Sequence, residues 1–370
     1  MITYLGFVFV VLILILYSNY IRRKGFEELT IERTVSKDKL EVGEEFYLYT
    51  LVENRKKVPV PFLNIRQGFP TELTDNLGKH HNNMFFNIKG FERAKGKVKL
   101  KAGKRGVYLL KDLKISLGDM LGFNIETKEM EDFKEIVVYP KLKNFNSYEV
   151  INNNIQGDNL IKRWIFQDPL YIKSLREYNV EDRMKDIHWP SSLRQNKLMV
   201  KEYDFTSDKE LIFIINAQGG VPFYSYVDMD TIELGISLCI SMIKASIDIG
   251  VSTGLWTNAY IASFSGSFIN KIEPKNNSFK DILELCGRMT LPPRNEFSVF
   301  IKENLQSFQS DKVYVIIASF LDEESISLLI KLKNSGINIK LMDISTGANL
   351  PDVVGIERIV VREDGKHGTA

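Results

Sequence analysis

Residues 211–215 read Leu-Ile-Phe-Ile-Ile, and residues 313–317 read Val-Tyr-Val-Ile-Ile. Such continuously apolar runs are typical of strands that are buried on both faces of a mainly parallel sheet. Further strands are expected at residues 249–256, 265–272, 337–342 and 356–361. Apolar residues recur at helical spacing over residues 231–247, 279–289, 297–308 and 323–333. Residues 210–363 therefore predict an α/β domain, with a mainly parallel sheet and helices on both of its faces.

The chain before this region has a different pattern. Residues 45–52 alternate between polar and apolar side chains and are rich in β-branched and aromatic residues. Similar short segments occur at residues 29–33 and 136–139. Period-two alternation is typical of half-buried strands. Turn-forming residues separate the segments: Gly43, Pro59, Pro61, Gly103, Gly106, Gly118 and Pro140. We therefore predict an all-β domain, an antiparallel β-sandwich, over residues 26–145.

The composition is that of a globular protein with more than one domain. The chain has 370 residues, and its 49 Lys and Arg against 47 Asp and Glu give a net charge of +2. This balance excludes a strongly basic nucleic-acid binder, so no nucleic-acid partner is expected. Cys239 and Cys286 lie far apart in apolar segments and predict buried free thiols.

The sequence lacks the common catalytic and metal-binding motifs. Its four histidines have neither H-E-x-x-H spacing nor a setting of paired cysteines. No G-x-S-x-G segment marks a nucleophile turn. We therefore expect no catalytic residues and no enzymatic activity.

Residues 2–21 carry no charge and contain the apolar run of residues 5–16. About twenty residues in a helix span the hydrocarbon core of a bilayer. Arg22, Arg23 and Lys24 follow the run, and the positive-inside rule places such a flank in the cytoplasm. We predict a transmembrane anchor over residues 1–22 that contacts membrane lipid. The expected localisation is the cell membrane, with a single pass and a cytoplasmic body.

A basic strip runs through the predicted sandwich. Its charges occupy alternate positions before a turn: Lys95, Lys97, Lys99, Lys101, Lys104 and Arg105. On a strand, this alternation places the lysines on one face. The strip predicts a solvated face or a sheet edge protected by lysines. Anionic lipid headgroups are the next alternative, and nucleic acid is the third.

Residues 176–194 between the two predicted domains combine many charges with an aromatic residue, Trp189. We expect Arg176 and Arg194 to pair with carboxylates and Trp189 to pack between the domains. One interpretation is a segment that binds a partner or couples the domains. The alternative is an interdomain brace with no partner.

This segment resembles the hallmark of the bacterial "domain of unknown function 58" family, which runs R-x-Y-x-x-G-D-x-x-R-x-I-x-W-x-x-S-A-R and then L-x-V-[KR]-E. The matching residues are Arg176, Tyr178, Asp182, Ile187, Trp189, Ser192, Arg194, Leu198, Val200, Lys201 and Glu202. Glu181, Lys185 and Leu193 depart from the family's glycine, arginine and alanine. The register of the motif is kept throughout, and Lys185 is one of its candidate residues.

The resemblance extends over nearly the whole chain. Residues 104–108 are similar to the family's R-G-x-Y element, residues 118–123 to D-P-L-G-L-F, and residues 138–140 to V-Y-P. Members are membrane-anchored relatives of von Willebrand factor A domains, so the resemblance implies a von Willebrand factor A-like, Rossmann-type domain at residues 210–363. Residues 146–209 would then be a linker that carries the family motif.

Domains of that type often hold magnesium through D-x-S-x-S after the first strand, because Mg²⁺ prefers hard oxygen ligands. This chain has Asn216, Gln218 and Gly220 at those positions, which lack the carboxylate and the hydroxyls. The resemblance therefore implies a degenerate metal site. We expect no metal and no cofactor.

Members of the family are typically found beside MoxR-type AAA+ ATPases and membrane proteins with transglutaminase-like domains. The resemblance thus implies a non-enzymatic, membrane-anchored adaptor that works with such an ATPase in the assembly or regulation of protein complexes. One alternative is a structural envelope-assembly protein without an ATPase partner. Another is an undescribed hydrolase that uses Asp182, Asp186 and His188 as acid and base.

Overall fold

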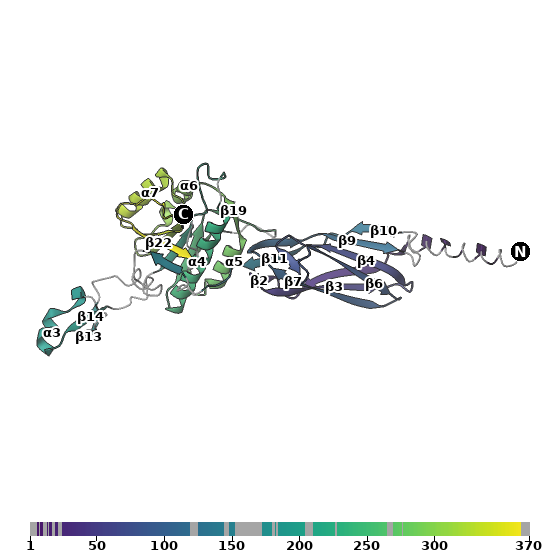
Figure 1. Ribbon diagram of the computed structural model, residues 1–370, viewed down its shortest axis with the longest axis horizontal. Coiled ribbons are helices and arrows are strands. Elements are labelled where there is room, and N and C mark those ends of the chain that lie inside the picture. The colour runs from purple at the N-terminus through teal and green to yellow at the C-terminus, as the bar shows by residue number, and fades with distance from the viewer. Residues whose placement is uncertain are drawn as a thin grey trace. The chain divides into compact units, whose positions relative to one another are not determined.

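The computed structural model describes most of the chain between residues 24 and 363. The described ranges are 24–118, 125–143, 148–151, 172–179, 182, 184–203, 210–225, 228–264, 269–275 and 277–363, together with residues 6, 8, 9, 13, 15, 16, 19 and 20. The chain divides into two compact units, Met1–Lys141 with Ser263–Ser265, and Leu142–Ala262 with Gly266–Ala370. Figure 1 labels the elements of both units.

The first unit is a β-sandwich of two four-stranded sheets, in which every strand pair is antiparallel. One sheet has the order β1-β3-β7-β5 and the other β10-β9-β4-β6. Their strands are β1 Leu29–Val35, β3 Glu45–Asn54, β4 Val60–Gly68, β5 Leu73–Asp75, β6 His81–Ile88, β7 Arg93–Ala102, β9 Leu113–Gly118 and β10 Ile125–Glu129. A third sheet joins β2 (Lys39–Glu41), β11 (Lys134–Tyr139) and β8 (Gly106–Leu110), with β2 and β11 parallel.

Alternation along the strands builds the core of this unit. In β3, Phe46, Leu48 and Val52 are buried, whereas Glu45 and Tyr47 are exposed. A strand turns successive side chains to opposite faces, so the apolar positions line the interior between the sheets. Two apolar clusters fill that interior, one around β3 and β11 and one around β4 and β9.

The main sheet of the second unit has seven strands in the order β12-β22-β21-β20-β15-β16-β18. Their bounds are β12 Tyr148–Ile151, β15 Leu211–Ile215, β16 Thr253–Thr257, β18 Lys271–Lys275, β20 Val313–Ala318, β21 Asn338–Asp343 and β22 Glu357–Glu363. The five strands from β22 to β16 pair in parallel. The edge strands β12 and β18 are antiparallel to their neighbours.

Four helices cover the two faces of this sheet. Leu211 and Phe213 of β15 pack in one apolar cluster with residues of α4 (Met229–Asp248) and α5 (Phe279–Arg288). Ile212 and Ile214 pack in another with residues of α6 (Phe297–Glu303) and α7 (Glu323–Asn334). The continuously apolar sequence of β15 follows from this burial on both faces. A short helix, η3 (Leu305–Ser307), and a two-stranded sheet of β17 (Ala259–Ile261) and β19 (Met289–Pro293) complete this part.

The expected buried thiols are confirmed, since Cys239 and Cys286 are free and fully buried. Burial raises the pKa of the Cys239 thiol well above its ordinary value, because a thiolate would lose its hydration there. The Cys239 thiol is therefore held in the unreactive protonated form.

The predicted fold class needs correction. Strands make up 41% and helices 24% of the structure, so the chain is mainly β. The large sheet is mixed, with antiparallel strands at both edges, and not the Rossmann-type, von Willebrand factor A-like sheet that was expected. The physical reason is that apolar runs report burial of the central strands but carry no information on the polar edge strands, such as Lys271–Lys275.

The predicted membrane anchor also needs correction. Within the part of the chain that the structure describes, no helix combines the length and the apolar character needed to cross a membrane. The single-pass membrane localisation and the lipid contact through the anchor therefore lose their support. Most of residues 1–22, on which the prediction rested, lie outside the described residues. An apolar run meets the length requirement of a spanning helix, but length and hydropathy alone do not form one.

Candidate functional site

The family motif forms a small module of its own, here called the motif module (residues 172–203). Strand β13 (Ile172–Glu177) pairs antiparallel with β14 (Met199–Tyr203), and the helices η2 (Met184–Asp186) and α3 (Trp189–Gln195) lie between them in the sequence. Ile187 forms an isolated bridge with Val200. Ile187, Met199 and Val200 are buried and make the apolar centre of the module.

Ser192 joins α3 to β14. Its hydroxyl donates to the carbonyl of His188 at 3.0 Å and accepts from the backbone N–H of Met199 at 2.8 Å. The side chain is buried, with 7% of its surface exposed. A hydroxyl that both donates and accepts in a small interior fixes the position of the helix on the strand. Ser192 is therefore a structural residue of the motif.

Arg176 and Asp182 form a two-pronged ion pair. The guanidinium Nη1 and Nη2 lie 2.7 and 2.5 Å from Asp182 Oδ2 and Oδ1. The same carboxylate accepts from the backbone N–H of Asn179 at 2.7 Å. Arg176, followed by the Asn179 N–H, holds the pKa of Asp182 below its ordinary value despite partial desolvation. The predicted pairing of Arg176 with a carboxylate is confirmed, and it closes the loop between β13 and η2.

Helix α3 begins where the local sequence supports a helix start. The ring nitrogen Nδ1 of His188 accepts from the backbone N–H of Ser191 at 3.2 Å and lies 2.8 Å from the Ser191 hydroxyl. Pro190 occupies the first turn, where its missing N–H costs nothing. Asn196 ends the helix in the left-handed conformation, with φ of 52°. These caps hold a helix of only seven residues in place.

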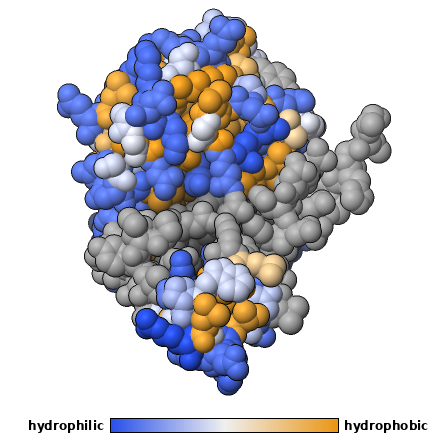
Figure 2. All heavy atoms as spheres, turned by 90° about the vertical axis from the view of Figure 1, so that its left-hand side faces the viewer, coloured by the Kyte–Doolittle hydropathy of each residue, from blue (hydrophilic) through white to orange (hydrophobic). Residues whose placement is uncertain are grey.

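The module exposes a group of large apolar side chains, here called the apolar patch: Met184 (70% exposed), Trp189 (56%), Leu193 (81%) and Leu198 (45%). Trp189 and Leu193 are four residues apart on α3 and so share one face of the helix. Figure 2 shows apolar side chains on this module with hydrophilic ones around them. Clusters of this kind mark interaction sites more often than isolated exposed residues do.

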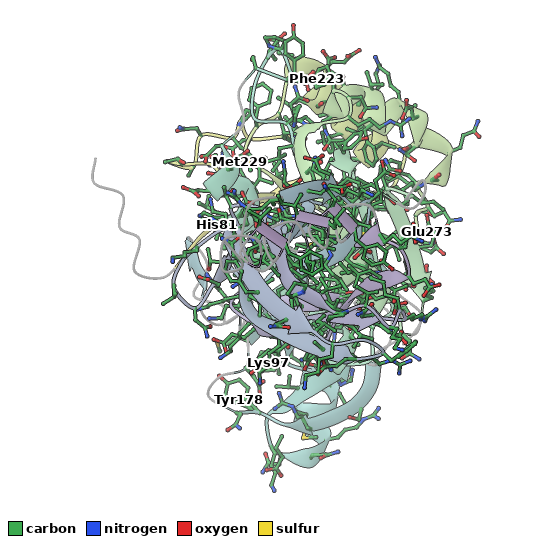
Figure 3. The ribbon with its side chains drawn as sticks, turned by 90° about the vertical axis from the view of Figure 1, so that its right-hand side faces the viewer. His81, Lys97, Tyr178, Phe223, Met229 and Glu273 are labelled. Carbon is green, nitrogen blue, oxygen red and sulfur yellow. The ribbon has the colours of Figure 1, made fainter. Side chains whose placement is uncertain are left out.

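The expectation that Trp189 packs between domains is wrong, because more than half of its side chain is exposed. Arg194 is also exposed, and no carboxylate of the described residues contacts it, so its predicted pairing is not found. Tyr178, labelled in Figure 3, is half-buried, and its backbone N–H donates to the carbonyl of Leu198 at 2.9 Å. Lys201 is half-buried on β14. The side chains of Lys185 and Glu202 lie outside the described residues.

The residues proposed for a hydrolase have structural contacts. Asp182 binds Arg176 and the Asn179 N–H, and its lowered pKa keeps it a carboxylate rather than a proton donor at neutral pH. His188 uses Nδ1 to cap α3. These contacts give both side chains a structural role in the motif module.

The positions of the degenerate metal site form an amide network at the carboxyl end of β15. Asn216 Oδ1 accepts from the Gln218 N–H at 2.9 Å and from Asn258 Nδ2 at 3.2 Å, while Asn216 Nδ2 donates to the Phe320 carbonyl at 2.8 Å. Gln218 Oε1 accepts from the backbone N–H of Phe297, and its Nε2 donates to the Gly220 carbonyl. The amide oxygens at 216 and 218 thus already accept N–H groups. The network ties together the loops that follow β15, β16 and β20.

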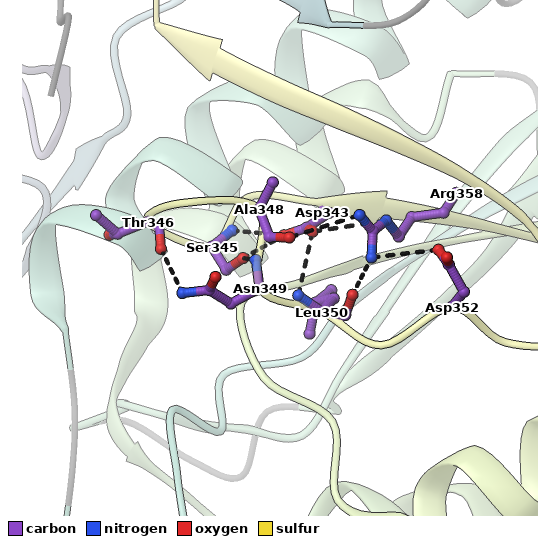
Figure 4. Close-up of polar contacts among 8 residues, drawn as sticks. All are labelled: Asp343, Ser345, Thr346, Ala348, Asn349, Leu350, Asp352 and Arg358. Carbon is purple, nitrogen blue, oxygen red and sulfur yellow. Dashed lines mark hydrogen bonds and ion pairs between the residues drawn. The ribbon is translucent and has the colours of Figure 1, made fainter. Parts of the chain in front are cut away.

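A second polar cluster lies at the carboxyl end of β21 (Figure 4). Asp343 is fully buried, and its Oδ1 accepts from the hydroxyl and backbone N–H of Ser345 at 2.6 and 2.8 Å. Its Oδ2 accepts from the Leu350 N–H at 3.3 Å and lies 3.9 Å from Arg358 Nε. Arg358 also donates to the Leu350 carbonyl. The buried carboxylate therefore organises the loop that precedes β22.

Sequence reasoning missed two features of the candidate site. It gave no role to Met184 and named Leu193 only as a departure from the family motif, although a helix start at His188-Pro190 puts Leu193 on the same face as Trp189. It also missed Asn258, whose side chain donates to Asn216 and accepts from the Ala217 N–H at 2.8 Å. Asn258 follows a buried strand, and that position was the available signal.

Comparisons with known proteins give one relative of moderate coverage. No family model matches the chain. The chain is similar to the uncharacterised protein YeaD of Bacillus subtilis (strain 168), with 24% identity over 252 residues. The match covers 65% of this chain and 58% of that protein, so the chain spans less than two thirds of the relative's length.

Solved structures similar to the chain are β-domains. They include a CARDB domain from Pyrococcus furiosus (TM-score 0.22, 15% identity, 30% of this chain and 94% of that one). A type II cohesin domain from the cellulosome of Acetivibrio cellulolyticus gives a TM-score of 0.20 at 12% identity, over 29% of this chain and 94% of that one. A mutant of Salmonella alpha-2-macroglobulin gives 0.24 at 16% identity, over 34% of this chain and 8% of that one. Scores this low carry no argument about function.

Proposed function

We propose that the chain is a non-enzymatic adaptor whose motif module binds a partner protein through the apolar patch. The observation that carries this proposal is the exposure of Trp189 and Leu193 on one face of α3. Tryptophan and arginine are among the residue types that contribute most to protein–protein binding, and Arg194 lies in the last turn of the same helix.

Some motif residues stabilise the module and others are exposed on its surface, and this difference supports the proposal. Arg176, Asp182 and Ser192 hold the module together through the contacts described above. Trp189 and Arg194 make no such contacts with the residues that the structure describes, and both are exposed. A fold that uses buried polar contacts to present exposed apolar side chains is suited to binding, because the surface is already ordered before the partner arrives.

The partner class that we propose is a MoxR-type AAA+ ATPase, with a transglutaminase-like membrane protein as a second member of the assembly. This follows from the resemblance of the motif to the "domain of unknown function 58" family, and membership of that family is part of the proposal. Its support is the register of the motif, which the chain keeps from Arg176 to Glu202.

The test compares surface variants with a matched control. The tagged full-length chain is mixed with a purified MoxR-type AAA+ ATPase from the same organism, and the dissociation constant is measured for wild type, Trp189→Ala and Leu193→Ser. Loss of a central aromatic contact is expected to cost about 2 kcal/mol, roughly a 30-fold weaker affinity. Leu77→Ser, which changes a leucine of the first unit that is 76% exposed, should bind as wild type does.

One result would exclude the apolar patch as the binding surface, and another would favour a different function. Equal affinity of all four proteins would show that the apolar patch takes no part in the contact. Absence of any complex with the ATPase would favour a structural role in envelope assembly, and the motif module would then be an interdomain brace.

A further inference from the structure

The outer face of β7 in the first unit carries a row of lysines. Lys95, Lys97 and Lys101 are exposed, and Lys99 lies half-buried between them. The intervening residues point inward: a Cβ on Gly96 would lie 2.4 Å from Met84 Sδ. Alternate residues of a strand are about 6.8 Å apart, so the lysine side chains leave the backbone of β7 at that repeat. Lys97 is labelled in Figure 3.

On one side of the row, β3 provides partners in a regular register. Glu45 Oε2 lies 2.5 Å from Lys99 Nζ, and Glu53 Oε1 lies 2.8 Å from Arg93 Nη2. Between these ion pairs, Lys95 Nζ stands 4.0 Å from the ring centre of Tyr49. Strand β3 therefore places a carboxylate at each end of the row, at Glu45 and Glu53, across an antiparallel register.

The other side of β7 is a free edge. Strand β5 pairs only with Leu100–Ala102, so β3 is the one strand of the described residues that pairs with β7 over residues 93–99. No carboxylate of the described residues contacts Lys95, Lys97 or Lys101 at ion-pair distance. Unpaired backbone groups on a sheet edge are a template for another strand. On β7, this free edge carries Lys95 and Lys97, and neither contacts a carboxylate of the described residues.

We propose that this edge of β7 binds an extended acidic peptide of a partner protein, which adds to the sheet as a further antiparallel or parallel strand. Backbone hydrogen bonds to residues 93–99 would supply affinity, as in other cases of strand addition. Asp or Glu at every second position of the peptide has the same repeat of about 6.8 Å as the lysines. Its carboxylates would then stand opposite Lys95 and Lys97, as Glu53 already stands opposite Arg93.

The aromatic residues of this face favour a peptide over a single-stranded nucleic acid. Nucleic acids of that kind are bound by stacking their bases on open aromatic rings. Lys95 covers the Tyr49 ring, and Tyr49 and Tyr47 lie against each other with their ring centres 6.1 Å apart. The face thus offers charges in a row rather than open rings. This surface lies apart from the apolar patch in the sequence, and the inference does not rest on the adaptor proposal.

The experiment measures binding of a fluorescent peptide, (Glu-Thr)₅, to the full-length chain by anisotropy. The double variant Lys95→Glu/Lys97→Glu reverses two cross-strand attractions and should weaken binding by about 10-fold or more. The control double variant Lys57→Glu/Lys111→Glu changes two exposed lysines elsewhere on the unit and gives the same net charge. This control should bind the peptide within about twofold of wild type. Any weakening that it does show measures the loss of long-range attraction caused by the lower net charge.

Three competitors separate the alternatives. The same peptide with alternate backbone nitrogens methylated should not bind, because it cannot donate hydrogen bonds to the edge; equal binding would overturn strand addition. A single-stranded oligonucleotide or a vesicle of anionic lipid should compete poorly; competition as strong as that of the peptide, lost in the β7 variant, would show a general polyanion surface. Absence of peptide binding to wild type would leave the lysines as edge protection against self-association and reject the proposal.

Discussion

Arg33 places a guanidinium in the core of the first unit. Its Nε lies 2.8 Å from Asp132 Oδ2, and Nη2 donates to the carbonyls of Leu110 and Asp132. The arginine side chain is fully buried, and Asp132 is the one carboxylate among the described residues that pairs with its charge. Asp132→Ala should lower the free energy of unfolding by about 3 kcal/mol, because a buried charge loses its partner.

Urea unfolding followed by circular dichroism checks this value, with Asp38→Ala as the control at an exposed aspartate. The control should change stability by less than about 0.5 kcal/mol. A loss for Asp132→Ala no larger than that of the control would contradict the role given to the ion pair.

A substitution at Asn216 tests the amide network at the carboxyl end of β15, the position of the degenerate metal site. Asn216→Asp removes the donor to the Phe320 carbonyl and puts a carboxylate at a position that is 2% exposed. We expect a loss of about 2–3 kcal/mol at pH 7. Burial raises the pKa of such a carboxyl, so the loss relative to wild type should shrink as the pH falls toward about 4 and the group protonates.

Thermal unfolding of both proteins at pH 7 and pH 4.5 measures the difference. An equal loss at both pH values would show that the missing donor, and not the charge, accounts for the effect. A variant stabilised by millimolar Mg²⁺ would instead show that the three loops can hold a metal once a carboxylate is present.

Some of the site residues could be predicted from sequence and others could not. The density of charge around residue 176 predicted an ion pair of Arg176 with a carboxylate, because several acidic residues follow it closely in the sequence. The exposure of Trp189 could not be predicted, since an aromatic residue among charges is compatible with either a buried or a surface position. The contacts of Asn258 depend on the meeting of three loops and leave no local pattern.

At the scale of elements, the motif module depends on the Arg176–Asp182 pair. Arg176 depresses the pKa of Asp182 in the folded chain, so the pair stabilises the module above the unfolded value of about 4 and is lost as the pH falls through the lower folded value. We expect the amide protons of residues 172–203 to lose protection below about pH 4, while the Asp182→Asn variant shows weak protection at every pH. Because the side chains of Arg176 and Asp182 are partly exposed, the ion pair should change the stability of the motif module only slightly.

Hydrogen exchange measured by mass spectrometry between pH 3 and pH 6, after correction for the intrinsic exchange rate, follows this segment directly. Protection in the wild-type module that stays constant over that range would contradict the stabilising role of the ion pair.

The elements themselves were largely predictable, and their arrangement was less so. The apolar run 211–215 coincides with β15, and the helical spacing of 231–247 falls within α4. These elements are buried on defined faces, and the spacing of their apolar residues in the sequence indicates those faces. Edge strands such as Lys271–Lys275 are polar and short, so their direction is decided by pairing with a neighbour and not by their own sequence.

At the scale of the whole molecule, two surfaces of different chemistry stand out. The motif module exposes apolar side chains around Trp189, and β7 of the first unit exposes a row of lysines. Both lie on small or edge elements, where binding does not require the core to open. An adaptor needs more than one such surface, because it must hold two partners at once.

Site-specific photocrosslinking tests the central claim most directly. A benzoylphenylalanine at position 193, where Leu193 is 81% exposed, reports the partner of the apolar patch in living cells, and the same residue at position 77, where Leu77 is 76% exposed, is the matched control. We predict a crosslink from position 193 to a MoxR-type AAA+ ATPase that is absent from position 77 and lost in a Trp189→Ala background. Failure of position 193 to crosslink to the ATPase, or an equal crosslink from both positions, would contradict the proposal that the motif module is its docking surface.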